Sequence, residues 1–99
     1  TFSRGESLTG YFDGYNIATL IGEPTAGTNG NVNPFDLLGS LKVRWTGMEV
    51  RKHDHSRHHA IGFIPDVLVK RTKQGIAEGR DEVLEKALEL AREAIAEGK

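Results

Sequence analysis

Cysteine is absent from the 99-residue chain. Disulfide bonds, thiolate metal sites and a cysteine nucleophile are therefore excluded, and the composition suits an oxidising or a reducing compartment. No apolar run approaches the roughly 18 residues that a membrane-spanning helix needs, and no signal peptide opens the chain. The first residue is not methionine, which suggests a fragment or a processed product whose targeting signal would lie upstream.

Net charge is almost absent as well. Lysine and arginine number 13 and aspartate and glutamate 14, so the formal net charge is -1. A surface for nucleic acid or for an anionic membrane needs a basic excess, which this sequence lacks. At this length the chain fits one domain and would bury roughly two-thirds of its unfolded surface if it folded alone. We therefore expect a marginal core and no nucleic-acid partner.

Hydrophobic periodicity predicts a helix near the start of the chain. From Ser3 to about Tyr15, apolar and aromatic residues recur at spacings of three and four, as they do on one face of a helix. Three glycines in the same segment weaken the helix. The residues that define this face are Leu8, Tyr11, Phe12 and Tyr15.

A second helix is predicted from about Arg80 to Ala96. Asp81 and Glu82 lie in its first turn, where carboxylates interact favourably with the helix dipole. Gly98 is a suitable stop signal. One apolar stripe runs along it and consists of Val83, Leu84, Ala87, Leu88, Ala91, Ala94 and Ile95. This stripe needs a sheet or another helix to cover it.

Strands are predicted in three places. The apolar run Ile17–Ile21 is short enough for a buried strand. Residues 31–52 read as two or three antiparallel strands joined by glycine-containing turns. A last strand is expected near Pro65, which removes an amide donor, so that this strand starts late or runs at an edge.

The stretch IGEPTAGTNGN, residues 21–31, places three glycines directly after the apolar run. Glycine adopts backbone conformations that other residues avoid, and it allows another group to approach the backbone closely. The stretch therefore suits a turn that contacts a substrate. A flexible surface loop is the alternative.

Near the start, the sequence SRGE from Ser3 to Glu6 has the spacing of a helix capping box. A serine in this position can instead be a nucleophile, because the free amides at a helix start stabilise an oxyanion. The amide of Arg4 would then be the donor. One hydroxyl cannot serve both roles well, and the spacing alone leaves both open.

Five motifs follow one another along the chain. They are SRGE, ATLIGEPTAGTNGN, WTGMEV, GFIPDV and GRDEVLEKALELA. Together they resemble the final part of the C-terminal-processing, or tail-specific, serine peptidases, whose superfamily includes the tricorn core peptidases. The resemblance implies an α/β fold in which residues 1–99 are the C-terminal portion of a spiralled β-β-α core of the crotonase and Clp-protease kind, with a terminal helix. The upstream part of that core would be absent.

This resemblance implies a serine endopeptidase that acts on protein or peptide substrates without a cofactor or a metal. Ser3 would be the nucleophile and the Arg4 amide an oxyanion donor. The active-site turn beside them would consist of Gly27, Thr28, Asn29 and Gly30. The expected partners are the substrate and the missing N-terminal part of the same protein, and a homo-oligomer is a further candidate. A typical bacterial member would be periplasmic or otherwise extracytoplasmic.

The general base is the point at which the sequence departs from the family pattern. In the lysine-dependent branch the base is a lysine at the end of the turn, where this chain has Thr28. The tricorn-like branch uses an upstream histidine and a downstream glutamate before a GxxPD-like return, and that place holds His59. We therefore expect this chain to carry the nucleophile but not the base, with His59 as a candidate base or orienter.

Four histidines and a carboxylate lie close together between His53 and His59. Imidazole and carboxylate groups suit zinc, copper or nickel, but the crowding in a turn argues against a metal site. A base or orienter from this loop is a second interpretation. The favoured one is an exposed polar loop at the rim of the active site.

A function of a different class is a non-catalytic module that binds an apolar ligand, as in the interphotoreceptor retinoid-binding proteins, whose repeats resemble the same fold. Phe35, Trp45 and Phe63 could line such a site, although aromatic residues on strands belong more often to the core. An intact serine at the helix start favours the peptidase.

Overall fold

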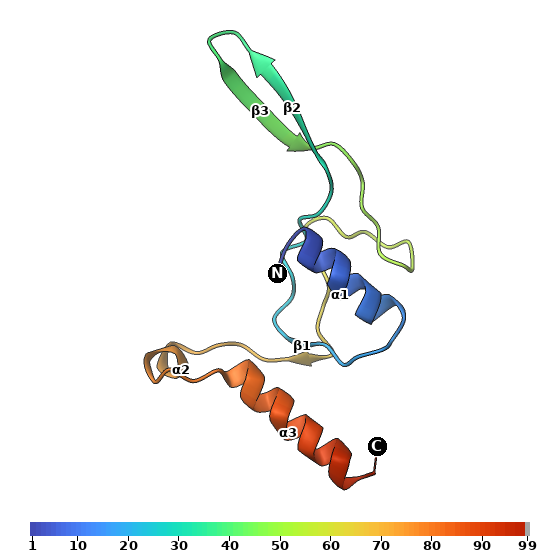
Figure 1. Cartoon of the computed structure of the whole chain (residues 1–99), viewed down its shortest axis with the longest axis vertical. Helices are drawn as coiled ribbons and strands as arrows, with labels where there is room; N and C mark the ends of the chain where they lie inside the picture. The colour runs from blue at the N-terminus through green and yellow to red at the C-terminus, as the bar shows by residue number, and fades with distance from the viewer. Residues whose placement is uncertain (99) are drawn as a thin grey trace. The chain divides into compact units, whose positions relative to one another are not determined.

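A computed structural model describes residues 1–98 (Figure 1). The chain forms two compact units. The first combines residues 1–18 with 25–63, and the second combines residues 19–24 with the chain from residue 64 onward. Helices and strands occur in both, which agrees with the α/β class.

In the first unit, helix α1 spans Arg4–Gly14 and confirms the predicted N-terminal helix. Ser3 is its N-cap, and Gly10 is one of its two buried residues. A Cβ atom at Gly10 would lie 2.9 Å from the Phe63 ring, so the absence of a side chain allows this ring to pack on the helix. The predicted apolar face stays exposed, with Leu8 and Tyr11 each more than half accessible.

Strands β2, Val32–Leu37, and β3, Leu41–Thr46, form an antiparallel hairpin, as predicted. No third strand follows in residues 48–50. That segment is held by a side chain instead, because the Val50 amide donates to Nε2 of His59 at 2.9 Å. Arg51 and Arg57 then form an isolated antiparallel β-bridge across the histidine loop.

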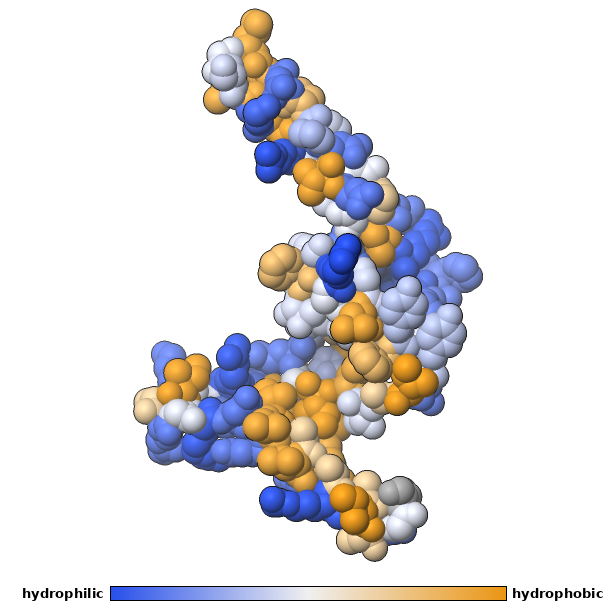
Figure 2. All heavy atoms as spheres, viewed as in Figure 1, coloured by the Kyte–Doolittle hydropathy of each residue, from blue (hydrophilic) through white to orange (hydrophobic). Residues whose placement is uncertain are grey.

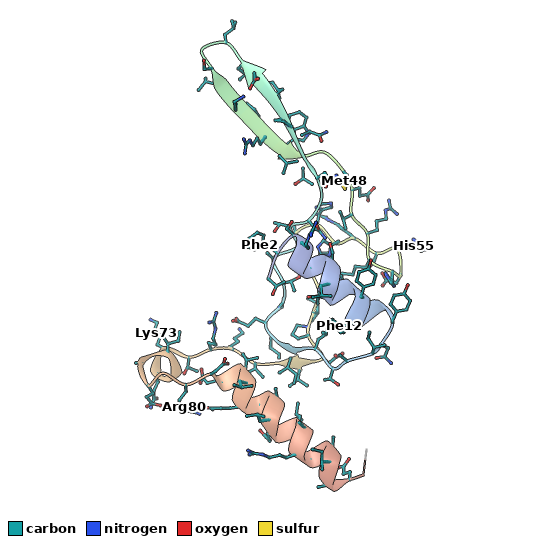
Figure 3. All side chains as sticks on the ribbon, viewed as in Figure 1. Phe2, Phe12, Met48, His55, Lys73 and Arg80 are labelled. Atoms are coloured by element: carbon teal, nitrogen blue, oxygen red, sulfur yellow. The ribbon has the colours of Figure 1, made fainter. Side chains whose placement is uncertain are left out.

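One face of the hairpin is predominantly apolar and the other is mixed. Directly opposed residues share a face in an antiparallel pair, so Phe35 with Val43, Leu37 with Leu41 and Asn33 with Trp45 all point to one side. The opposite face carries an ion pair of 2.8 Å between Lys42 and Asp36. All twelve strand residues are exposed, and their side chains project freely in Figure 3.

In the second unit, strand β1, Ile21–Gly22, pairs in parallel with β4, Val67–Leu68. The predicted strand from Ile17 to Ile21 is therefore wrong in extent. Ile17 cannot join a ladder because its amide donates to the Phe12 carbonyl at the end of α1. The late start of β4, two residues after Pro65, agrees with the prediction for that strand.

Helix α3, Glu82–Ala96, confirms the predicted C-terminal helix. The Asp81 side chain caps it by accepting a hydrogen bond from the Leu84 amide at 3.0 Å. A short helix, α2, Lys73–Ala77, precedes it and was not predicted, since a single turn carries too little periodicity to be recognised. α3 packs against β1, and the cavity between them is lined by residues that include Thr19, Ile21, Val67, Ala87 and Leu90.

The described residues bury very little apolar surface. Phe63, 7% exposed, is the one buried large apolar side chain among them. Two polar side chains, Glu6 and His58, are buried more completely, at 0% and 1% exposed. Apolar atoms reach the surface both on the hairpin and along α3 (Figure 2). The centre of the first unit is thus a polar cluster beside one aromatic ring.

Candidate active site

Ser3 begins α1 in an unusual backbone conformation. Its φ is 52° and its ψ is -124°, a region that residues other than glycine rarely occupy. The Ser3 amide donates to the Thr28 carbonyl oxygen at 2.7 Å. This bond places the turn of residues 27–30 directly beside the helix start. The sequence-predicted nucleophile and turn therefore lie together.

Ser3 and Glu6 have the arrangement of a capping box, but only one half of it is a hydrogen bond of good geometry. The Ser3 amide donates to Oε2 of Glu6 at 3.2 Å, while the Ser3 hydroxyl faces the Glu6 amide as in a capping box but does not form a full hydrogen bond with it. The Glu6 amide donates to the Ser3 carbonyl oxygen instead, at 2.8 Å. The capping interpretation thus accounts for the Glu6 carboxylate better than for the Ser3 hydroxyl.

Arg4 occupies the first helical position. Amides in the first turn have no intrahelical acceptor, and the Arg4 amide makes no hydrogen bond within residues 1–98. Its side chain is exposed. A free amide next to Ser3 at the positive end of a helix can stabilise an oxyanion.

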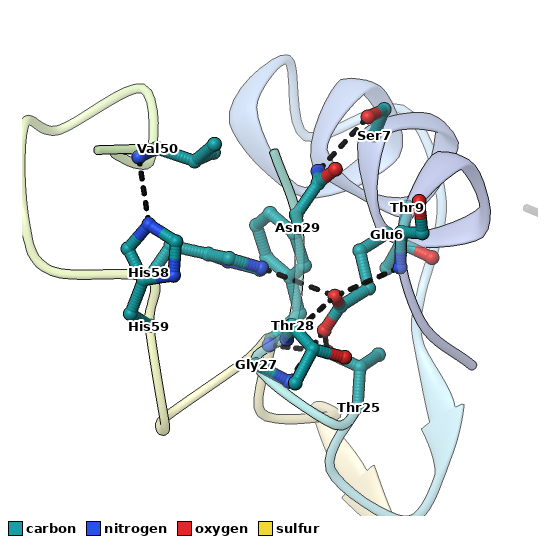
Figure 4. Close-up of polar contacts among 12 residues, drawn as sticks. Glu6, Ser7, Thr9, Thr25, Gly27, Thr28, Asn29, Val50, His58 and His59 are labelled. Atoms are coloured by element: carbon teal, nitrogen blue, oxygen red, sulfur yellow. Dashed lines mark hydrogen bonds and ion pairs between the residues drawn. The ribbon is translucent and has the colours of Figure 1, made fainter. Parts of the chain in front are cut away.

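The Glu6 carboxylate is the centre of the site (Figure 4). Its Oε1 accepts from Oγ1 of Thr25 and from the Gly27 amide, both at 2.6 Å. Its Oε2 accepts from the Thr28 amide at 3.0 Å, in addition to the Ser3 amide. One buried side chain thereby joins the helix start to the turn. Sequence spacing predicts a capping role for Glu6, and it cannot show that the turn of residues 25–28 supplies three further donors.

Opposing effects act on the pKa of Glu6. Burial alone would raise this pKa, because it removes the charged form from water. Hydrogen bonds from Thr25 and Gly27, together with His58, outweigh burial and hold the pKa below its usual value. Glu6 is therefore an ionised carboxylate at neutral pH.

His58 approaches the same carboxylate from the loop of residues 50–62. Its Nε2 lies 3.3 Å from Oε2 of Glu6 and has no other partner within the described residues. The His58 ring also packs on Phe63, with ring centroids 5.1 Å apart. The prediction of an exposed polar loop at the rim of the active site is thus wrong for His58. A carboxylate and an aromatic ring together compensate the burial of its side chain. Four histidines so close in sequence gave no sign of which one is buried.

The turn that contains Gly27 is anchored rather than loose. Gly27 has a φ of 67°, and a Cβ atom there would lie 2.7 Å from the Ile61 amide nitrogen. The Gly27 carbonyl oxygen accepts from the Ala60 amide at 2.9 Å. Oγ1 of Thr25 also accepts from the Phe63 amide at 2.9 Å. The turn is therefore held against the segment of residues 60–63, contrary to the interpretation as a flexible surface loop.

The remaining turn residues are placed next to α1. Nδ2 of Asn29 donates to Oγ of Ser7 at 3.0 Å, and Oδ1 of Asn29 accepts from the Gly30 amide at 2.9 Å. Gly30 has a φ of 120°. Thr28 contacts Ser3 and Glu6 through its backbone.

The other histidines have separate environments. Nε2 of His59 accepts from the Val50 amide, and the His53 ring meets Tyr15 edge-on at 4.9 Å. His55 lies at the loop tip with a φ of 65° (Figure 3). Within residues 1–98, no histidine forms a hydrogen bond with Ser3, and no group of three or more ligating side chains is placed to hold a metal ion.

A small cavity lies along α1, one turn beyond Ser3. Its volume is about 180 Å³, and its walls include Ser7, Gly10, Asn29, Lys52 and Phe63. Glu6 and His58 also border it. The buried pair therefore lies next to a space that is open to a ligand.

None of the helices in the described part is long and apolar enough to cross a membrane. Among curated proteins, none matches the chain significantly. The family model of peptidase family S41 matches residues 1–69, a range that contains Ser3, Glu6, the turn of residues 27–30 and the whole histidine loop. This match covers more than half of the chain, and the chain belongs to peptidase family S41.

Proposed function

We propose that this chain is the part of a serine endopeptidase that carries the nucleophile, and that the nucleophile is Ser3. The observation that carries the proposal is the backbone of Ser3. It has a left-handed φ of 52° at the start of α1 and is held by hydrogen bonds to Thr28 and Glu6. Strained residues that their surroundings hold in place are concentrated at functional sites. Family membership supports the same reaction class.

In this reaction, Oγ of Ser3 forms a bond to the carbonyl carbon of the scissile peptide as its proton passes to a general base. The negative charge moves to the carbonyl oxygen, towards which the Arg4 amide donates. The C–N bond then breaks, the amine leaves with a proton from the protonated base, and an acyl-enzyme remains on Ser3. Water hydrolyses the acyl-enzyme and regenerates the hydroxyl.

We propose that the base is a histidine from outside these residues. His58 faces Glu6, and Nε2 of His59 is occupied by the Val50 amide. This bond leaves Nδ1 of His59 available, so His59 remains a candidate for orienting the base. With Thr28 in place of the family lysine, kcat/KM should rise as pH passes through about 6.5, the ordinary pKa of histidine. A profile that rises only in the range of a lysine would contradict this assignment.

The proposed setting is a spiralled crotonase-like core, to which residues 1–99 contribute the C-terminal portion. The exposed apolar surfaces of the hairpin and of α3 support a setting in which further protein covers them. The substrate is a protein or peptide, and additional copies of the chain are a further possible neighbour.

The test is labelling of the full-length protein with a fluorophosphonate, combined with peptide hydrolysis. We expect the label on Ser3, and we expect Ser3→Ala to lose both labelling and hydrolysis while its thermal midpoint stays close to that of the wild type. Ser40→Asn, which removes a serine from the exposed hairpin turn and tolerates its φ of 61°, should still be labelled at Ser3. Hydrolysis that survives in Ser3→Ala would show that Ser3 is only a cap. A folded wild type without labelling or hydrolysis would favour the non-catalytic ligand-binding module.

A further inference from the structure

We propose that His58 is a positioning residue for Ser3, which it reaches through the carboxylate of Glu6. This inference rests on the proposed peptidase function and assigns a role to a histidine that the family resemblance did not single out.

Burial makes the contact between the two side chains unusual. Glu6 is 0% and His58 1% exposed, and polar groups buried to this degree are costly unless another group compensates them. Nε2 of His58 has no hydrogen-bond partner of ordinary geometry within residues 1–98, and it faces Oε2 of Glu6 at 3.3 Å. The carboxylate is therefore the group that compensates this nitrogen.

The two oxygens of Glu6 do not have the same neighbours. Oε1 is fixed by the short bonds from Thr25 and Gly27, at 2.6 Å each. Oε2 has longer bonds, 3.0 Å from the Thr28 amide and 3.2 Å from the Ser3 amide. His58 approaches Oε2, the oxygen that also holds Ser3. A donor at this point can thus keep the carboxylate oxygen in the place that the Ser3 backbone requires.

His58 is itself held firmly enough for this role. Its carbonyl oxygen accepts from the Ile61 amide at 3.1 Å and from the Gly62 amide at 2.9 Å. The tight turn that these bonds close is joined to Gly27 through the Ala60 amide. The loop, the turn and the helix start therefore form one hydrogen-bonded group, in which His58 supplies the side chain of the loop that points to Glu6 (Figure 4).

Two substitutions distinguish the effect of losing the N–H donor of His58 from the effect of losing its ring. His58→Gln keeps an N–H donor near the position of Nε2, whereas His58→Phe keeps a ring of similar size without a donor. His55→Asn is the control, because it removes a histidine from the exposed tip of the same loop and asparagine tolerates the left-handed φ of 65°. All three are made in the full-length protein. The readouts are the rate of fluorophosphonate labelling at Ser3, kcat, KM and the thermal midpoint.

We expect His58→Phe to lower the labelling rate and kcat by roughly 10- to 100-fold, the range that a small misplacement of a reacting group produces. KM should change by less than about twofold, because the role proposed for His58 is to hold Ser3 through Glu6 and not to bind substrate. His58→Gln should recover most of the rate, and His55→Asn should match the wild type. Recovery by glutamine would distinguish a positioned donor from general packing.

Wild-type labelling and kcat in a folded His58→Phe would overturn the inference. The inference would also be overturned if His58→Gln folds with a wild-type thermal midpoint but its labelling rate and kcat are at least about tenfold lower than those of the wild type. The result for His58→Gln is decisive if His58→Phe fails to fold. In both cases Ser3 of the wild type is labelled, so the proposed function stands. If the wild type is neither labelled nor active, the proposed function fails and the role of His58 fails with it.

Discussion

At Glu6, the ionised state of one carboxyl group is linked to the stability of the site. Hydrogen bonds from the turn hold its pKa below the usual value despite burial. A carboxyl group with a lowered pKa stabilises the folded state at pH above its ordinary pKa, and this contribution is lost as pH falls through the lowered value. The site should therefore be most stable near neutrality and weaken in acid.

We predict that Glu6→Gln destabilises the full-length protein by about 3 kcal/mol at neutral pH, because an amide presents one acceptor where the site offers donors to two oxygens. The difference in unfolding free energy between the wild type and the variant should shrink as pH falls below the ordinary range of a glutamate. Denaturant unfolding between neutral and acidic pH measures this. A difference independent of pH would mean that Glu6 does not titrate as we describe.

Two threonines of the turn make a matched comparison. Oγ1 of Thr25 both donates to Glu6 and accepts from the Phe63 amide, whereas Thr28 contacts Ser3 and Glu6 through its backbone. Thr25→Val should therefore cost about 2 to 3 kcal/mol and lower activity strongly. Thr28→Val keeps its backbone bonds and should reduce the rate only modestly. Abolished turnover in a folded Thr28→Val would show that its hydroxyl has a direct role.

At the scale of elements, the close approach of two backbone segments shapes the site. Gly27 fits because nothing larger than hydrogen stands between it and the amide nitrogens of residues 60–62. Gly39, in the hairpin turn, also has a positive φ, 79°, but no atom lies within 4 Å of a Cβ placed there. The two glycines thus share a left-handed backbone, which would strain any other residue, and they differ in crowding.

We predict that Gly27→Ala destabilises the protein by about 3 kcal/mol or more, because strain and steric overlap add. Gly39→Ala should cost only about 1 kcal/mol, from the left-handed backbone alone. Thermal unfolding of both variants tests the comparison, and labelling of Ser3 should fall only in Gly27→Ala. Equal midpoints would mean that the segment of residues 60–62 can move away without cost.

At the scale of the whole molecule, exposed apolar surface is the dominant feature. Phe35, Leu41 and Trp45 on the hairpin are each more than two-fifths accessible, as are Leu84 and Leu88 on α3. Soluble monomers rarely leave large contiguous apolar patches open, and both edges of a two-stranded hairpin are open to pairing. The described residues therefore favour association.

We predict that the isolated 99-residue chain has no peptidase activity and either self-associates or unfolds readily. A serine hydroxyl without a base is a weak nucleophile at pH 7. Sedimentation gives the mass, and the fluorescence of Trp45, the one tryptophan of the chain, should shift to the blue when its face is covered. Hydrolysis that disappears in Ser3→Ala, from a stable monomer, would contradict the prediction and locate the base within these residues.

Local patterns were sufficient for α1, α3 and the hairpin, because their periodicity and turn residues act over a few neighbours in sequence. They failed for the segment from Ile17 to Leu20, whose apolar character resembles a strand although the Ile17 amide closes the end of α1. The same limit applied to the histidine loop. Burial of His58 depends on Glu6 and Phe63, one of them 52 positions earlier in the chain.

Residue types at fixed spacings were enough to predict the helix that begins after Ser3, the glycine turn and the peptidase family. They could not show that the Glu6 carboxylate holds Ser3, Thr25, Gly27 and Thr28 together or that His58 faces it. A buried charge must collect its donors from whichever segments the fold brings within hydrogen-bonding distance. Here the turn and the histidine loop both lie far from Glu6 in sequence.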